Sequence, residues 1–306
     1  MTPVATVAAV AKIVLLDGNW VGYIGDKKVT SSYDQTRTVK MMAKAGYPNA
    51  AIQGVDVTAE VEEEDTSSEW PINQRFDFVA QLVGMIADNS ATSVIVTGPG
   101  GLGKTHTVKA ALEAHGLEDV SALDCTTAPA RSYKMIKGYS TAKGLYRELF
   151  NNKDSVLVFD DCDDVLKDAT ALNLLKGALD SYDQRVITWN TDKGDDDLPR
   201  SFVFQGRVIF ISNMKRKQIA DALLTRAYCV DLKMTVQQKV ERMEHMVADD
   251  AFMPHYSQRI KQDAMDLIKS LQGDVKELSL RTLQAVAKLR AAGGNWENIA
   301  KYVLTN

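Results

Sequence analysis

The spacing of apolar and polar residues differs between parts of the chain. Between residues 93 and 231, short continuous apolar runs alternate with amphipathic stretches, which is typical of a mostly parallel sheet buried on both faces. The strands expected there cover 93–97, 120–124, 155–159, 207–212 and 227–231. One helix is expected before this range, after Trp70-Pro71 and through about Ala87, and the helices expected within it cover 104–114, 142–150 and 170–179. Residues 192–199 are rich in aspartate and fit neither a strand nor a helix of this alternating pattern, so an exposed loop is predicted there.

The two ends of the chain have patterns of their own. From Thr235 onward the spacing of apolar residues is helical throughout, which predicts an all-helical domain. Its helices are expected through 240–246 and over 255–271, 279–291 and 296–303. Near the N-terminus, two apolar runs flank Asp17-Gly18-Asn19 and predict a hairpin, and a helix is expected over Tyr33–Ala45.

An acidic stretch with a single apolar residue, 60–69, separates this small unit from the rest and predicts a linker. We therefore expect an N-terminal unit over 1–59 that serves as an adaptor or an oligomerisation element. An α/β domain over 70–233 and a helical domain over 234–306 complete the expected organisation.

Composition narrows the class of protein. Apolar residues make up 45% of the 306 positions and charged residues 25%, which excludes collagen-like, disulfide-scaffold and disordered chains. No apolar run approaches the ~20 residues that cross a bilayer, and no basic residue precedes the apolar run 4–10. We therefore expect a cytoplasmic protein with no membrane partner. Cys125, Cys162 and Cys229 stand too far apart for a zinc site and are interpreted as reduced thiols.

Charge is unevenly distributed. The net charge of −4 combines −4 over 1–70, −6 over 71–199 and +6 over 200–306. The basic last third is suited to an acidic partner, whereas the acidic first part argues against DNA binding by the N-terminal unit.

A phosphate-binding loop is the most specific motif of the chain. It matches G-x-x-x-x-G-K-[ST] at every fixed position, follows an apolar strand and opens a helix. The glycines allow backbone N–H groups to face phosphates, Lys104 reaches the β- and γ-phosphates, and Thr105 ligates Mg²⁺. His106 follows the loop and is included among the predicted nucleotide-binding residues, although it is interpreted as a bystander to the chemistry. The loop consists of Gly98, Pro99, Gly100, Gly101, Leu102, Gly103, Lys104 and Thr105.

Two carboxylates end a buried strand about 50 residues later. Asp160 is placed to hold the Mg²⁺ coordination shell, and Asp161 to orient or deprotonate an attacking water. The alternative for both is a solvated acidic turn, since Asp163 and Asp164 follow closely.

From about Trp70 to Asn306, the chain resembles the AAA+ ATPases. Asn213, at the end of the strand 207–212, is similar to that family's sensor 1, which polarises the attacking water. The segment that ends in Arg226 is similar to its arginine-finger segment, and Arg281 lies where the lid helix carries sensor 2. Alternatively, Arg226 and Arg281 are surface charges, with Arg216 as a rival finger.

This resemblance implies an α/β P-loop NTPase fold, with a parallel sheet of about five strands flanked by helices and followed by a helical lid domain. It also implies ATP and Mg²⁺ as cofactors and a homo-oligomer, expected to be a hexamer. A departure is Asp161, because the family usually has glutamate there; slow turnover is one consequence. Phe202-x-Phe204-x-Gly206-Arg207 resembles AAA+ proteins encoded by bacteriophages, which would place the protein in the host cytoplasm.

In ring-forming members, the segment after the second strand lines the central pore, and here that segment is 131–139. Lys134, Lys137 and Tyr139 in it suit a nucleic-acid track, because basic groups follow phosphates and aromatic rings stack on bases. A polypeptide track and a packed loop remain alternatives.

We expect a motor or remodeller acting on nucleic acid or a nucleic-acid-bound protein. The competing hypothesis is a nucleotide-gated loader or switch that recruits a protein partner. A protein unfoldase and a small-molecule kinase are less favoured.

Overall fold

The computed structural model describes residues 11–16, 19–24, 27–32, 35–45, 47, 51–52, 70–122, 129, 131–138, 141–182, 184–190 and 198–305. The chain divides into two compact units, 1–66 and 67–306. The boundary falls inside the predicted linker 60–69, which lies outside the described residues.

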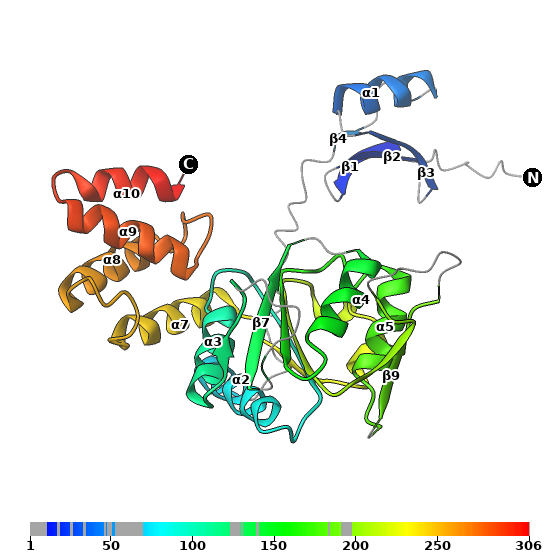
Figure 1. The fold of residues 1–306 in the computed structure, drawn as a ribbon. Helices are drawn as coiled ribbons and strands as arrows, with labels where there is room; N and C mark the ends of the chain where they lie inside the picture. The colour runs from blue at the N-terminus through cyan, green and yellow to red at the C-terminus, as the bar shows by residue number, and fades with distance from the viewer. Residues whose placement is uncertain are drawn as a thin grey trace, which may run out of the picture. The chain divides into compact units, whose positions relative to one another are not determined.

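The N-terminal unit is a small sheet with one helix. The strands β1 (Ala11–Leu16) and β2 (Asn19–Ile24) form the predicted antiparallel hairpin, and β3 (Lys27–Ser32) pairs antiparallel with β2. Helix α1 (Gln35–Lys44) lies along one face of this sheet (Figure 1). β4 (Ala51–Ile52) adds a parallel strand beside β1, giving the order β3-β2-β1-β4. Neither β3 nor β4 was expected.

Helix α1 packs on the sheet through one buried side. Thr38 and Met42 lie four residues apart, on one side of the helix, and both are fully buried. Met42 packs directly on Gly22, where a Cβ atom would overlap the Met42 sulfur. The glycine thus allows the close approach of helix and strand.

The second unit is built on a six-stranded parallel sheet. Its strand order is β12-β5-β11-β8-β7-β6, with helices on its faces (Figure 1), as expected for the α/β class. Its strands are β5 (Ser93–Thr97), β6 (Glu118–Asp119), β7 (Ser132–Lys137), β8 (Val156–Asp160), β11 (Arg207–Ser212) and β12 (Tyr228–Asp231). Its helices are α2 (Ile72–Ala87), α3 (Lys104–Ala114), α4 (Ala142–Asn151), α5 (Ala169–Ala178), the short α6 (Asp221–Leu224) and the 3-10 turn η1 (Arg216–Gln218).

This strand order brings the segments after β5, β8 and β11 close together. β5 is fully buried between β11 and β12, and β11 lies between β5 and β8. Since all these pairs are parallel, the segments that follow β5, β8 and β11 leave the same edge of the sheet.

The second strand of the domain was predicted wrongly. It is β7, at 132–137, and not 120–124; only Glu118 and Asp119 form the short edge strand β6 beside it. Val120 still donates its backbone N–H to the Tyr133 carbonyl at 3.0 Å, but residues 123–124 lie outside the described part of the chain.

An antiparallel hairpin, β9 (Arg185–Thr188) and β10 (Ser201–Phe204), is inserted between α5 and β11 and was not expected. The aspartate-rich stretch predicted as a loop connects these two strands, and residues 191–197 lie outside the described part.

The C-terminal region is helical, as predicted. It contains α7 (Val236–Ala248), α8 (Gln258–Ser270), α9 (Leu280–Ala292) and α10 (Trp296–Thr305). Thr235 and Gln238 form the expected capping box at the start of α7. The region shares one apolar core with α2 and α3, so it is part of the second unit. Within the described residues, no helix has the length and apolar character to cross a membrane.

Candidate active site

The phosphate-binding loop has the backbone its sequence predicts. Gly98, Gly101 and Gly103 adopt φ values of +141°, +73° and +99°, which side-chain-bearing residues rarely reach. A Cβ atom at Gly98 would lie 2.9 Å from the Leu232 carbonyl oxygen, so packing excludes a side chain there as well. α3 begins at Lys104, so the last two residues of the loop form the start of this helix. Its free N–H groups and dipole favour an anion at this point.

Lys104 is buried at the centre of the site. Its Nζ donates to the carbonyl oxygens of Gly98 and Pro99 and to Asn213 Oδ1, each at 2.8 Å. Burial lowers the pKa of Lys104 to about 8, although the nearby Asp161 and Asp160 carboxylates act in the opposite direction. The loop therefore presents a partly desolvated ammonium group, which an incoming phosphate would stabilise.

Asp160 ends β8 and is buried beneath the loop. Its Oδ1 accepts a hydrogen bond from Thr105 Oγ1 at 3.0 Å, and its Oδ2 lies 3.2 Å from Lys137 Nζ. A hydroxyl and a carboxylate side by side are the oxygen donors that Mg²⁺ prefers. The residues present therefore fit the ion that the motif implies.

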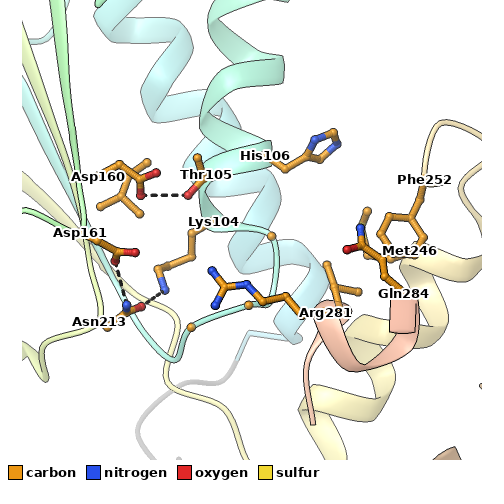
Figure 2. A pocket seen from close by; sticks show the side chains of 15 residues that line it. Lys104, Thr105, His106, Asp160, Asp161, Asn213, Met246, Phe252, Arg281 and Gln284 are labelled. Atoms are coloured by element: carbon orange, nitrogen blue, oxygen red, sulfur yellow. Dashed lines mark hydrogen bonds between the residues drawn. The ribbon is translucent and has the colours of Figure 1, made fainter. Parts of the chain in front are cut away.

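Asp161 is exposed and adopts φ +56°, a left-handed conformation that aspartate tolerates better than most residues. Its Oδ1 accepts a hydrogen bond from Asn213 Nδ2 at 2.8 Å. Since Asn213 Oδ1 in turn accepts from Lys104, these three side chains form one hydrogen-bonded chain across the ends of three elements (Figure 2).

The start of α9 closes the site from the helical region. Leu280 donates its backbone N–H to the Gly101 carbonyl at 2.7 Å, and Ser279 caps the helix. Arg281 projects from this end into the space in front of Lys104 (Figure 2). The structure thus brings Arg281, which was predicted as the sensor 2 residue, together with the phosphate-binding loop.

The resulting cleft has a volume of about 260 Å³, near the lower end of the range for ligand pockets. His106, which follows the loop, is one of the residues that line the cleft. Sequence reasoning missed the far wall: Met246, Phe252 and Gln284 come from the helical region. Their only sequence signal was the apolar spacing of the helices.

A second residue that the sequence did not single out is Arg242, on α7 and behind the loop. Its guanidinium stacks on the Phe76 ring at 3.7 Å and donates to Asn73 Oδ1 at 3.1 Å. A Cβ atom at Gly103 would lie 3.6 Å from Arg242 Nη2. Burial lowers the pKa of Arg242 to about 10. Arg242 therefore supports the loop and joins it to the helical region.

Arg226 lies away from this cleft. Its carbonyl accepts from Ser93 Oγ at 3.1 Å, at the opposite end of β5 from the loop. Five strand residues at about 3.3 Å each place roughly 16 Å between this point and the phosphate-binding loop. Its side chain is exposed, donates to the Ala222 carbonyl at 2.9 Å, and lies 4.0 Å from Asp180. The rival Arg216 is exposed on η1.

The segment expected to line a pore is instead part of the sheet. Lys134 and Lys137 belong to β7, where Lys134 pairs with Glu148 of α4 at 2.9 Å and Lys137 with Asp160. Residues 132–137 therefore form a strand of the sheet and not, as expected, the segment that follows one. Tyr139 lies outside the described residues.

The chain is similar in sequence to one protein family and to a phage protein. Residues 94–238 match the family described as AAA, ATPase family associated with various cellular activities. An uncharacterized 36.7 kDa protein from the nrdC-mobD intergenic region of Enterobacteria phage T4 is 29% identical over 295 residues. That match covers 90% of this chain and 86% of the phage protein.

Among solved structures, NtrX from Brucella abortus in complex with ADP aligns at 14% identity with a TM-score of 0.46. The alignment covers 85% of this chain and 55% of that one, so the chain spans about half of NtrX. The family match contains the phosphate-binding loop, the acids that end β8 and the strand before Asn213, so the chain is similar to the AAA ATPase family over residues 94–238.

Proposed function

We propose that this protein is a ring-forming AAA+ ATPase that couples hydrolysis of Mg²⁺-ATP to movement or remodelling of a nucleic acid or nucleoprotein. Support for hydrolysis comes from the cleft, which gathers Lys104, Asp160, Asp161, Asn213 and Arg281 from four separate segments. Phosphoryl transfer requires phosphate binding, Mg²⁺ binding and activation of a water, and each of these residues is suited to one of these tasks.

The proposed role of each residue follows from its position in the cleft. Lys104 and Arg281 supply positive charge where the terminal phosphates of ATP would lie. Thr105 and Asp160 would hold Mg²⁺, which supplies charge neutralisation at the phosphate oxygens when bound. Asp161 is the exposed carboxylate, suited to accept a proton from a water, and Asn213 orients it through the 2.8 Å hydrogen bond.

The location of Arg226 is the observation that carries the ring proposal. An arginine finger must reach the γ-phosphate, and Arg226 lies at the far end of β5 from its own loop. It is exposed and so available to the site of a neighbouring copy. A closed arrangement of copies would give every site a finger.

Complementation between two inactive variants tests this. Arg226→Ala keeps an intact cleft but lacks the finger, and Lys104→Ala keeps the finger but lacks phosphate binding. We expect Arg226→Ala to bind ATP normally and to lose at least about 10³-fold in hydrolysis. An equal mixture should recover about a quarter of wild-type turnover, since one random interface in four pairs an intact site with an intact finger. An Arg226→Ala protein with normal turnover, or a mixture that stays inactive while mass measurements show co-assembly, would refute the role in trans.

A loader or switch that hydrolyses ATP slowly is the second candidate. The observation in its favour is the short Asp161 side chain, held by Asn213 in a left-handed backbone conformation. Tight ATP binding with negligible turnover, accelerated by a protein partner, would favour it over the motor. Fast turnover by the purified protein alone would exclude it.

A further inference from the structure

The acidic net charge of the N-terminal part does not describe its folded portion. Residues 11–52, which contain all its strands and its helix, carry six Lys or Arg and three Asp, a net charge of +3. Residues 53–70 carry seven Asp or Glu and no basic residue. The acidic charge that argued against nucleic-acid binding therefore belongs to the linker, and the sheet itself is basic.

The strand register aligns two of these cations around a tyrosine. Lys12 of β1 pairs with Tyr23 of β2, and Tyr23 pairs with Lys28 of β3. Directly opposed residues of antiparallel strands point to the same face. Lys12, Tyr23 and Lys28 therefore form one row across three strands, which we call the Lys-Tyr-Lys row.

This row lies on the face of the sheet opposite α1. The neighbouring residues Ile13, Gly22 and Thr30 also oppose one another in register, and Gly22 and Thr30 contact α1 through Met42 and Met41. Because side chains alternate between faces along a strand, the Lys-Tyr-Lys row points the other way. Figure 1 shows α1 on a single side of this sheet.

The side chains of the row reach solvent. Lys28 is exposed, and Lys12 and Tyr23 are partly exposed. The register shifts between Gly22 and Tyr23, so Val29 is skipped and Lys28 comes opposite the tyrosine. This bulge places the second cation beside the ring. Val14, which is partly exposed, pairs with the buried Val21 in the next row of the same face.

We propose that the Lys-Tyr-Lys row binds single-stranded nucleic acid, with a base stacked on Tyr23 and backbone phosphates at Lys12 and Lys28. An aromatic ring between cations on a sheet face matches the alternation of base and phosphate along one strand. In a duplex the base faces are stacked on each other and unavailable, so the ring favours a single strand. The described part of the sheet presents no acidic side chain that would repel phosphate.

This proposal names the substrate-binding element of the function proposed above, and the two can fail separately. Binding of fluorescein-labelled 20-nucleotide dT, rU and duplex DNA is measured by anisotropy with the full-length protein and no ATP. ADP affinity is measured on every variant, and these substitutions should leave it unchanged, because none of the residues belongs to the cleft.

Lys12→Gln/Lys28→Gln should weaken single-strand binding about 25-fold at 0.1 M salt and lower the salt slope by about 1.4, as expected for two lost phosphate contacts. Tyr23→Leu should cost at least about fivefold, whereas Tyr23→Phe keeps the stacking surface and should bind normally. Lys12→Arg/Lys28→Arg should bind like the wild type and confirms that the sheet tolerates changes there. Comparison of dT with rU identifies the preferred single strand.

Lys40→Gln/Lys44→Gln is the matched control, since it removes two exposed cations from α1 of the same unit. It should have little effect. Equal losses in the two glutamine variants would overturn the proposal in favour of a diffuse charge effect. Wild-type affinity of Tyr23→Leu, or duplex binding as tight as that of dT, would overturn it by removing the role of stacking.

Discussion

Replacing Gly101 by alanine tests whether the docking of α9 on the phosphate-binding loop matters for stability and for nucleotide binding. Gly101 adopts φ +73°, its carbonyl accepts from Leu280 N–H at 2.7 Å, and a Cβ atom would lie 2.9 Å from the Ser279 Cβ. The left-handed backbone costs alanine about 1–2 kcal/mol. The overlap must also push Ser279 away, which removes a hydrogen bond worth about 0.5–1.5 kcal/mol. The free energy of unfolding should therefore fall by about 1.5–3.5 kcal/mol.

Gly116→Ala separates the cost of the left-handed backbone from the cost of the lost hydrogen bond. Gly116 has nearly the same φ, +75°, but the nearest atom to its Cβ position is Arg131 Nη2, at an ordinary 3.9 Å. It should lose only the backbone term, about 1–2 kcal/mol. Urea unfolding and ADP titration are the assays. Gly101→Ala should bind ADP about tenfold more weakly because Arg281 moves with α9, and Gly116→Ala should bind normally. Equal unfolding free energies with normal ADP affinity in both variants would refute the reasoning.

Three further outcomes are expected. Asp161→Asn should keep ADP affinity and lose at least about 10²-fold in phosphate release, since the amide is no base; normal turnover would exclude Asp161 as the acceptor. Thr105→Ala should weaken Mg²⁺-dependent ADP binding by about tenfold or more and leave binding in EDTA unchanged, because it removes the hydroxyl 3.0 Å from Asp160. Lys261→Met should lower the unfolding free energy by about 1–3 kcal/mol and weaken ADP binding, since buried Lys261 holds the Phe252 carbonyl; unchanged urea midpoints would contradict this.

Sequence reasoning located the parts of the site that are local in the chain. The phosphate-binding loop could be found because its glycines, Lys104 and Thr105 act within one turn of backbone. Asp160 and Asn213 could be placed near it because parallel strands end at a common edge, and the hydrogen bonds now link both to the loop.

What could not be predicted depends on partners distant in sequence. β7 contains two lysines among its six residues, so its pattern does not resemble a core strand. Lys134 is accommodated there because Glu148 of α4 pairs with it, a contact that no local pattern reveals. Met246 and Phe252 likewise reach the cleft only through the packing of α7 and the segment that follows it. The Lys-Tyr-Lys row depends on a bulge, and a one-residue change of register would have turned it to the other face.

The hydrogen bond between Leu280 and Gly101 joins the start of α9 to the phosphate-binding loop, so a movement of the loop there would tilt the whole helix. The helix has 13 residues, so at about 1.5 Å each its far end lies roughly 20 Å from that hydrogen bond. A tilt of about 10° at the loop would carry Ala292 through roughly 3 Å, close to the radius of a side chain. Displacements of the loop backbone too small to change its hydrogen bonds are thus magnified at the outer end of the helical region, where a neighbouring protein could sense them.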